Sequence, residues 1–332
     1  MLNYEIKSCL FESDFAILKS LLIKEGLSFD TYVTESFLLY DQNLPIATFS
    51  LYHHVIKMIA IKDSYQGQNI TTYIMNYLTS YLTEKGIFKY FLFTKPSQKY
   101  IFDALDFKLI LETQEVLFYE NKYQSIEDTL NDLKRQIDLS LNDVGSIVMN
   151  CNPITNGHLY LIEKASKNHE TLLIFLVEEN ESVFSFDVRY QLIKETTKHL
   201  SNVRILPSTK YIISKATFPS YFMKDINTHT HAYMQLDIQV FIAYFMKTFN
   251  ISKRYVGEEP LDPMTHLYNE TMHQLLGKKL EIIPRLSNNH QVISASYIRK
   301  LAKNKAFDEI KLLVPKPTYD YLISKEGQAL WT

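Results

Sequence analysis

Residues 146–167, which read SIVMNCNPITNGHLYLIEKASK, most constrain what this 332-residue chain can fold into. The stretch begins with a short apolar run, residues 147–149, of the kind that forms a buried parallel strand. It ends with Leu159, Ile162 and Ala165 at helical spacing. A strand that passes through a short turn into a helix points the main-chain N–H groups of the helix start at solvent, where they can bind an anion, usually phosphate. The stretch therefore predicts an α/β domain with an anion site at the end of a strand.

Thr155 and His158 stand three residues apart at the start of this helix and so share one face of its first turn. A hydroxyl and an imidazole N–H can there donate to one oxyanion, and Gly157 between them allows close approach to the main chain. The sequence Thr-Asn-Gly-His resembles the TxGH form of the HxGH signature of cytidylyltransferase-like nucleotidyltransferases. That resemblance implies binding of a nucleotide triphosphate and stabilisation of the transition state at its α-phosphorus. A capped helix with a surface histidine is the structural alternative.

A second segment, residues 291–299 (QVISASYIR), has the same character. Ser294 stands in N-cap position before a helix, and Ser296 and Arg299 lie three apart on that helix, so a hydroxyl and a guanidinium converge on one patch. The segment resembles the ISxTxxR motif of the same superfamily, with Ser296 in the place of the threonine. The resemblance implies that this helix holds the β- and γ-phosphates, while the first motif holds the α- and β-phosphates.

The elements between the two motifs predict the architecture of this half of the chain. Residues 171–177 read as a buried strand, 185–199 as a helix and 203–206 as another strand. A helix over about 236–249 and a strand over 254–257 follow. Strands and helices that alternate at this spacing predict a doubly wound, Rossmann-like parallel sheet, which binds ligands outside the carboxyl ends of its strands.

The first 123 residues predict a separate, mixed α/β fold. Helices are expected over 13–25 and 100–105 and from residue 71 onward, and strands over 37–40, 46–52, 55–61, 90–93 and 107–110. That order resembles the GNAT acetyltransferases. In that family a V-shaped opening between the central strands admits the pantetheine of coenzyme A.

The family's loop R/Q-x-x-G-x-G/A corresponds to Gln66, Asn69 and Thr71, and Gly67 lies within it. The resemblance implies that Gln66, Gly67 and Asn69 receive a pyrophosphate on main-chain N–H groups at a helix start. Asparagine tolerates left-handed backbone, so Asn69 can keep the shape of the loop, whereas Thr71 adds bulk near the ligand. A degenerate fold that serves only as a docking module is the alternative.

Polar residues from 121 to 142 separate the two halves, with Ile126, Leu130, Leu133 and Ile137 at helical spacing. The expected division is therefore a GNAT-like domain at 1–123, a connecting helix at 124–143 and a nucleotidyltransferase domain at 144–332.

Composition excludes several classes of protein. The formal net charge of −2 gives no excess of positive charge of the kind that general nucleic-acid binding needs. The two cysteines, Cys9 and Cys151, form neither a disulfide framework nor a metal-ligand cluster. The N-terminus carries charged residues where a signal peptide would be apolar, and no run approaches the roughly 18 apolar residues that span a bilayer. We expect a cytoplasmic chain that binds neither nucleic acid nor membrane, with no metal site of its own.

Over essentially its whole length the chain resembles the citrate lyase ligases. The segments that carry this resemblance are MNCNPITNGHLYLIEKAS, ATFPSYFMK, RYVGEEPLDPMTHLYNETM, IIPR and ISASYIRKL. The resemblance implies an enzyme that uses ATP and Mg²⁺ to activate acetate as acetyl-adenylate. It then acetylates the thiol of the dephospho-coenzyme A-type prosthetic group on the acyl carrier subunit of citrate lyase, releasing AMP and pyrophosphate.

Several alternatives stay open at this point. A pantetheine-phosphate or mononucleotide adenylyltransferase would use the same two motifs, and a non-catalytic regulatory module would bind nucleotide without turnover. Asn152 is expected to contact nucleotide or acetate, Asp262 either to hold Mg²⁺ through water or to cap a strand end, and Cys151 to serve packing. Further candidates are Arg189, Lys215, Lys224 and Arg285 as cationic contacts or salt-bridge partners, His53 and His54 as a polar turn, and His229 and His231 as a solvated loop.

Overall fold

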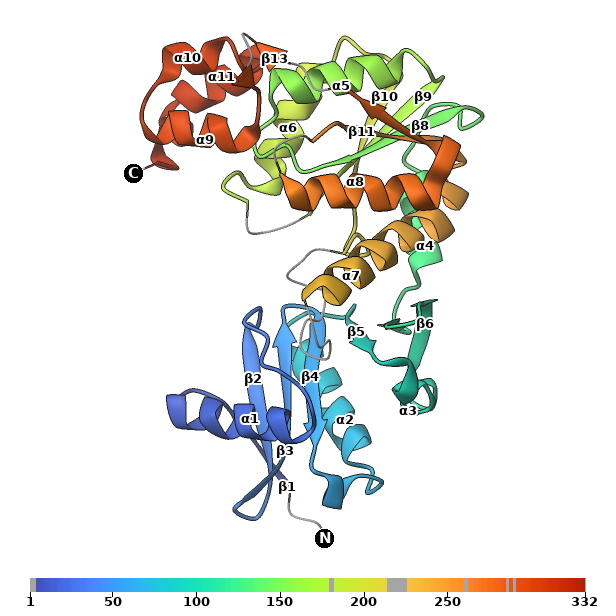
Figure 1. Ribbon diagram of the computed structural model, residues 1–332, viewed down its shortest axis with the longest axis vertical. Coiled ribbons are helices and arrows are strands. Elements are labelled where there is room, and N and C mark those ends of the chain that lie inside the picture. Colours follow the sequence, from blue (N-terminus) through green and yellow to red (C-terminus); the bar gives the residue numbers. More distant parts are fainter. Residues whose placement is uncertain are drawn as a thin grey trace. The chain divides into compact units, whose positions relative to one another are not determined.

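The computed structural model describes residues 4–178, 182–213, 226–259, 262–284, 287–288 and 291–331 (Figure 1). The chain divides into two compact units: unit 1 is Met1–Asp128 with Ile213–Asp237, and unit 2 is Thr129–Ile212 with Ile238–Thr332. Each unit has its own sheet and its own apolar core. The domain limits expected from the sequence stay predictions.

Unit 1 is built on a seven-stranded sheet. Its strands follow the order β1 (Tyr4–Ser8), β2 (Glu35–Asp41), β3 (Leu44–Tyr52), β4 (Val55–Ile61), β5 (Phe91–Thr94), β7 (Leu117–Asn121) and β6 (Phe107–Glu112). Helix α1 (Glu12–Lys24) covers one face and α2 (Ile70–Glu84) the other, because successive side chains of a strand point to opposite faces. Thus Leu38 packs with the core under α1, whereas Phe37 and Leu39 pack with the core under α2.

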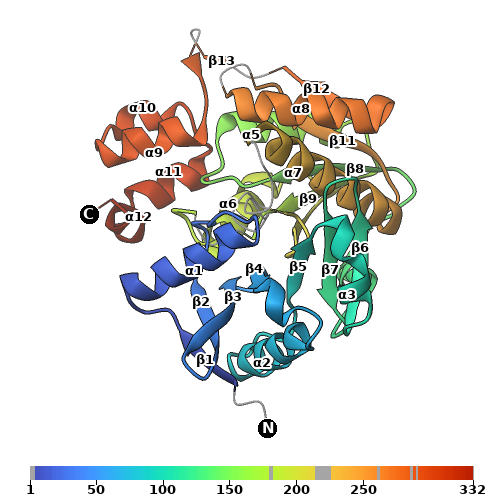
Figure 2. The same ribbon diagram turned by 60° about the horizontal axis from the view of Figure 1, so that its bottom comes forward.

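Strands β4 and β5 form the only parallel pair recorded in this sheet, which lies wholly within the described residues, and they pair over a very short length. The register contains Val55 with Phe91 and Ile56 with Leu92, after which the two strands diverge (Figure 2). This divergence is the V-shaped opening that the sequence predicted. The GNAT-like mixed α/β fold of this unit is confirmed.

Unit 2 contains a five-stranded sheet in which every recorded pair is parallel. The order is β10 (Val203–Pro207), β9 (Thr171–Leu176), β8 (Val144–Met149), β11 (Ile251–Gly257) and β12 (Leu280–Ile283). Helices α5 (Asn156–Ser166) and α6 (Phe186–Thr197) pack on one face. On the other face, Phe241 and Phe245 of a π-helical stretch surround Phe175 together with Phe249. The predicted doubly wound sheet is confirmed.

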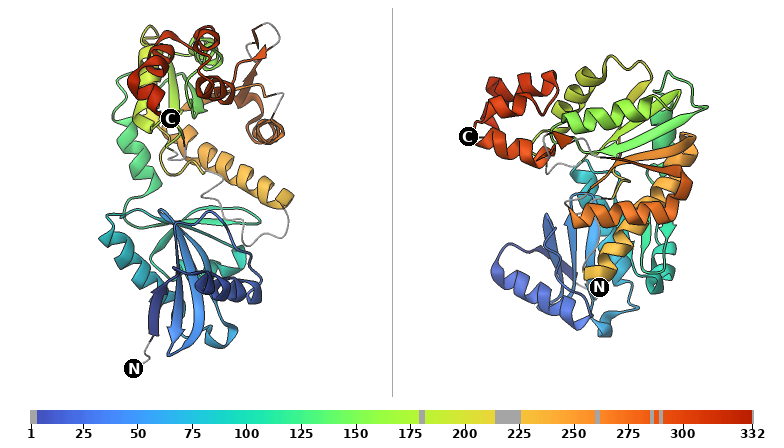
Figure 3. Two further views of the ribbon diagram at one scale, coloured as in Figure 1. Left: turned by 90° about the vertical axis from the view of Figure 1, so that its left-hand side faces the viewer. Right: turned by 45° about the horizontal axis from the view of Figure 1, so that its top comes forward.

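The C-terminal helices, red in Figure 3, form a cluster with a core of their own. They are α9 (Ala295–Lys303), α10 (Phe307–Lys311), α11 (Lys316–Ile323) and α12 (Lys325–Ala329). Ile298, Leu301 and Leu322 of this cluster pack with Phe184, which precedes α6. The remaining elements are α3 (Lys99–Asp103), α4 (Ile126–Lys134), α7 (Ile226–Val240), α8 (Pro263–Leu276) and the short pair β13 (Ser287–Asn288) and β14 (Gln291–Val292).

Three sequence expectations need correction. The sequence analysis predicted no element at β1, β7, α8, β12 or the helices α10 to α12, and β7 inserts between β5 and β6. The helix expected over 124–143 covers only Ile126–Lys134. His229 and His231 lie within α7, so the predicted solvated loop is wrong. The turn at His53 and His54 between β3 and β4 is confirmed. In the part of the chain that the structure describes, no helix is long and apolar enough to cross a membrane.

Gly145 in β8 provides a test of the packing in unit 2. A Cβ atom there would lie 3.0 Å from Cγ and Nε2 of His169, and the imidazole cannot yield, because it is hydrogen-bonded to Asp143 (2.7 Å) and Tyr255 (2.8 Å). We expect Gly145→Ala to lower the free energy of unfolding by about 2 kcal/mol in urea titration. Gly257→Ala is the matched control, since no atom lies within 4 Å of the added carbon. Equal effects of the two substitutions would contradict this account.

Candidate functional site

The first motif lies at the point where the sheet of unit 2 changes direction. From β8 the chain winds outward through β9 to β10, and it returns to pair β11 on the other side of β8. The turn that follows β8 leads into α5 at Thr155, outside the carboxyl end of the central strand. Ligands of doubly wound sheets bind at this switch point.

Thr155 and His158 are joined by a capping box. The N–H of His158 donates to Oγ1 of Thr155 (3.4 Å), and the N–H of Thr155 donates to Nδ1 of His158 (3.0 Å). Since Nδ1 accepts that bond, the neutral imidazole carries its proton on Nε2. Thr155 is buried and His158 is half-buried. The threonine therefore orients the histidine, and a direct donation from Thr155 to an oxyanion stays a prediction.

The second motif comes to the same place. Ser294 caps α9 by accepting a hydrogen bond from the N–H of Tyr297 (3.2 Å). A Cβ on Gly157 would lie 3.5 Å from the carbonyl oxygen of Ile293, the residue before this cap. The starts of α5 and α9 are therefore neighbours, although the two motifs stand far apart in the sequence.

Arg299 ties the two motifs directly, because its Nη1 donates to the carbonyl oxygen of Asn152. Burial lowers the pKa of the Arg299 guanidinium. The group still stays charged, because the ordinary pKa of arginine is very high. Ser296 is exposed, and its Oγ lies 3.1 Å from Oγ of Ser294. Asn152 also accepts a hydrogen bond from the N–H of Phe184 (3.1 Å) on its side-chain oxygen, so this oxygen serves the fold.

The C-terminal helices hold the turn from a further side, a set of contacts that the sequence did not predict. The main-chain N–H of Asn156 donates to the carbonyl of Leu313 (2.9 Å) and its side-chain amide to that of Leu312 (3.1 Å). Oγ1 of the buried Thr318 donates to the carbonyl of Ile154 (3.2 Å). Main-chain carbonyls accept all three bonds, and their positions leave no signature in side-chain patterns.

Arg189 was predicted as a cationic contact or salt-bridge partner, and it binds the turn that follows β8. Its guanidinium is fully buried and donates to the carbonyls of Asn150 (2.9 Å), Val177 (2.8 Å) and Phe184 (3.1 Å). It also donates to the side-chain oxygen of Asn150 (2.7 Å). Arg189 therefore joins the residues that follow β8 and β9 to Phe184, which stands two residues before α6, and its charged donors satisfy main-chain oxygens.

The other sequence candidates divide as follows. Cys151 is buried, and burial raises its pKa far above the ordinary range, which fits the predicted packing role. The carboxylate of Asp262 caps α8 by accepting from the N–H groups of Met264 and Thr265 (3.3 Å each). The hydrogen bond from the Thr265 hydroxyl, together with these two main-chain bonds, lowers the pKa of Asp262. Asp262 thus caps a helix and not the strand end that the sequence analysis considered. Lys215, Lys224 and Arg285 lie outside the described residues.

Among the described residues no three His, Cys, Asp or Glu side chains gather as a metal site.

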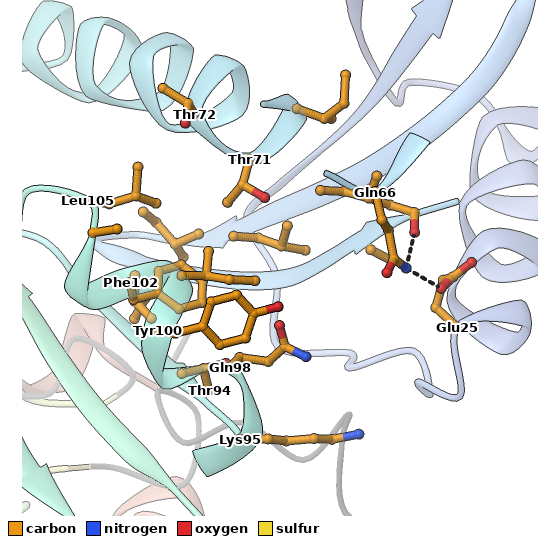
Figure 4. Close-up of a pocket in the computed structure, with 18 of the residues that line it drawn as sticks. Glu25, Gln66, Thr71, Thr72, Thr94, Lys95, Gln98, Tyr100, Phe102 and Leu105 are labelled. Atoms are coloured by element: carbon orange, nitrogen blue, oxygen red, sulfur yellow. Dashed lines mark hydrogen bonds between the residues drawn. The ribbon is translucent and has the colours of Figure 1, made fainter. Parts of the chain in front are cut away.

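Unit 1 contains a cavity of about 540 Å³ in the opening between β4 and β5 (Figure 4). Gln66, Gly67 and Asn69 all line it, so the structure brings these three predicted residues together. Asn69 occupies the N-cap position of α2 with φ at 61°, without a side-chain capping bond, and Gly67 has φ at 77°. Asn69 thus adopts the left-handed backbone that the sequence analysis expected of it. Thr71 also lines the cavity, and Phe102 and Leu105 lie on another side of it.

Comparison with known proteins gives similarity over most of the chain. The family model described as citrate lyase ligase C-terminal domain matches residues 144–322. A [citrate [pro-3S]-lyase] ligase of Haemophilus influenzae is 30% identical over 321 residues, which are 94% of this chain and 96% of that protein. The one from Klebsiella pneumoniae is 32% identical over 295 residues, 86% and 85% of the two chains. A phosphopantetheine adenylyltransferase of Syntrophomonas wolfei is 40% identical over 55 residues, 16% of this chain and 34% of that enzyme.

Arg189→Met tests whether this arginine supports the fold. The substitution leaves buried carbonyls at Asn150 and Val177 without their donor, so we expect the free energy of unfolding to fall by about 3 kcal/mol. Arg135→Met removes an exposed arginine that pairs only at the surface with Asp132, and we expect a change below about 0.5 kcal/mol. Urea titration of both variants measures these two changes in the free energy of unfolding. A stable Arg189→Met variant would assign its guanidinium to ligand binding instead.

Proposed function

Because the chain belongs to the citrate lyase ligase family, we propose that it activates acetate with ATP and acetylates the prosthetic-group thiol of the citrate lyase acyl carrier subunit. AMP and pyrophosphate are the other products. The observation that carries the proposal is the extent of the similarity, which covers 94% of this chain and therefore both units. The adenylyltransferase similarity covers only 34% of that enzyme's length.

The proposed reaction has two steps. In the first, a carboxylate oxygen of acetate forms a bond to the α-phosphorus of ATP, the bond from that phosphorus to the bridging oxygen breaks, and pyrophosphate leaves. In the second, the thiol loses its proton and its sulfur attacks the acetyl carbon. The bond between that carbon and the AMP oxygen breaks, and the thioester forms. Both steps build charge on phosphate oxygens, so catalysis rests on positioning and electrostatic stabilisation.

We assign the first step to the site in unit 2. His158 would donate from Nε2 to oxygens of the α- and β-phosphates, beside the N-terminus of α5, whose dipole favours an anion. Thr155 would position His158 through the capping box, and Gly157 would leave room for the phosphates. The capping box and the protonation of Nε2 that follows from it support this assignment.

The second motif would hold the β- and γ-phosphates. Ser294 and Ser296 supply hydroxyls at the start of α9, and Arg299 supplies a charged guanidinium with donors beyond the one that bonds to Asn152. We assign Asn152 to nucleotide binding through its side-chain amide nitrogen, because its side-chain oxygen already accepts from Phe184.

Mg²⁺ would arrive with the phosphates of ATP and neutralise part of their charge. The described residues contain no cluster that could hold a metal ion, and Asp262 uses its carboxylate as a helix cap. The proposal therefore gives Mg²⁺ no protein ligand, and no step above depends on one.

We assign the thiol arm of the carrier to the cavity in unit 1. Its volume of about 540 Å³ falls within the usual range for small-molecule sites. The divergence of β4 and β5 leaves main-chain groups on their facing edges without a cross-strand partner, and such edges pair with amide-bearing chains. Gln66, Gly67 and Asn69 would line the part of the cavity through which the arm extends.

The first test is acetate-dependent exchange of labelled pyrophosphate into ATP, with Mg²⁺ and without a thiol. We expect exchange in the unaltered chain and a loss of roughly 10²–10³-fold in His158→Ala, because a donor to the developing charge is removed. His199→Ala, which removes a half-exposed histidine on the same unit, is the control and should exchange normally.

If exchange is absent even with deacetylated citrate lyase present, the acetate-activating function is wrong. Exchange that requires phosphopantetheine in place of acetate would establish the adenylyltransferase alternative.

Asn69→Glu tests the division of labour between the units. Glutamate disfavours the left-handed backbone at this position and adds a charge to the cavity, so we expect acetyl transfer to the carrier to fall roughly 10²-fold while pyrophosphate exchange continues. Asn69→Gly keeps the backbone conformation and serves as the matched control. Loss of both activities in Asn69→Glu would contradict a separate thiol site in unit 1.

A further inference from the structure

The open end of the cavity in unit 1 has two sides of unlike charge. Strands β4 and β5 are parallel, so the loop that follows β4 and the residues that follow β5 lie at the same end of the opening. Gln66 and Glu25, which share a hydrogen bond, line the β4 side, whereas Lys95 directly follows β5. Glu25 and Lys95 are the charged residues of the lining, and Figure 4 shows Lys95 apart from Glu25.

On the β4 side the side-chain donors of Gln66 are already in use. Its amide nitrogen donates to a carboxylate oxygen of Asp63 (2.9 Å), to the carbonyl of Ile61 (3.1 Å) and to a carboxylate oxygen of Glu25 (3.3 Å). An amide nitrogen has two protons, and three acceptors compete for them. A diphosphate on this side would therefore meet two carboxylates and find no side-chain donor on Gln66.

On the β5 side three polar side chains have their donors available. Lys95 precedes and Gln98 ends a short 3-10 helix, in which the N–H of Gln98 donates to the carbonyl of Lys95 (2.9 Å), and Tyr100 lies in the first turn of α3. All three line the cavity, and Lys95 and Gln98 are half-buried. Within the part of the chain that the structure describes, none of the three side chains makes a hydrogen bond or an ion pair.

An ammonium, a carboxamide and a phenol can all donate to phosphate oxygens. The charged donor of the three, Lys95, forms the strongest of such bonds. Its neighbour Lys99 provides a contrast, because it pairs with Glu112 and does not line the cavity. The chain therefore directs an unpaired cation to the open end of the cavity on the β5 side.

We propose that Lys95, together with Gln98 and Tyr100, binds the diphosphate of the thiol arm, and that the loop at Gln66 only borders the arm. The inference rests on the proposed function and locates the charged part of its thiol substrate. The amide-bearing part of the arm lies between β4 and β5, and the diphosphate leaves the opening on the β5 side. Coenzyme A and the carrier-bound arm share this diphosphate, so both use the same contacts.

Calorimetric titration of the full chain with pantetheine and with dephospho-coenzyme A tests this assignment. We expect Lys95→Met to weaken binding of dephospho-coenzyme A roughly tenfold at low salt, because a charged donor to the diphosphate is lost, and to leave pantetheine within about twofold. The loss should shrink as salt screens the charges. Lys95→Arg keeps the charge and should bind dephospho-coenzyme A within about threefold of the unaltered chain. Lys99→Met, an equal change of charge outside the lining, is the matched control and should alter neither affinity.

Unchanged affinity of Lys95→Met for dephospho-coenzyme A would overturn the inference and return the diphosphate to the main chain of the loop. An equal loss for pantetheine would also overturn it, since Lys95 would then support the cavity and not the diphosphate. If neither ligand binds the unaltered chain, the assignment of the arm to unit 1 fails with it. Pyrophosphate exchange by the same preparation then shows independently whether acetate activation in unit 2 stands.

Discussion

The hydrogen bonds that hold the turn between β8 and α5 are the constraint on which unit 2 depends. Arg189 donates to the main-chain carbonyl of Asn150 in this turn, Arg299 donates to that of Asn152 from α9, and Leu313 and Thr318 bind the turn to the C-terminal helices. A turn at a switch point would otherwise leave these polar groups unpaired as the sheet is covered. Once they are paired, the start of α5, with the positive end of its dipole, is held in a fixed position, as an electrostatic site for phosphate requires.

The two units form their proposed ligand sites with different kinds of sheet. In unit 2 the order of parallel strands reverses beside β8, and the opening lies beyond the strand ends. In unit 1 a single parallel pair separates after two residues, and the opening lies between the strands. The first geometry presents helix N-termini, which suit anions, and the second presents sheet edges, which suit amides. This contrast matches the assignment of nucleotide to one unit and of an amide-bearing thiol arm to the other.

Periodicity predicted most of the helices and strands because their apolar faces are long and regular. It missed several elements, among them α8, and two of the missed strands are short and lack a regular pattern. β1 carries charged residues at an edge, and β7 is a brief buried strand, so neither has a clear alternation. The helix of His229 and His231 begins at Ile226, within a polar stretch that local sequence favours as a loop. The role of Arg189 is set by the main-chain carbonyls that it binds, and the sequence does not show where these carbonyls lie.

The sequence alone determined the α/β class of both halves, the two phosphate-type motifs and the left-handed residue Asn69, because each depends on residues adjacent along the chain. Only the tertiary structure decided that Arg299 joins both motifs through Asn152, and that Glu25 accepts from the side-chain amide of Gln66. It also decided that residues 213–237 group with unit 1. These outcomes depend on main-chain carbonyls and on residues distant in sequence, whose positions no local pattern encodes.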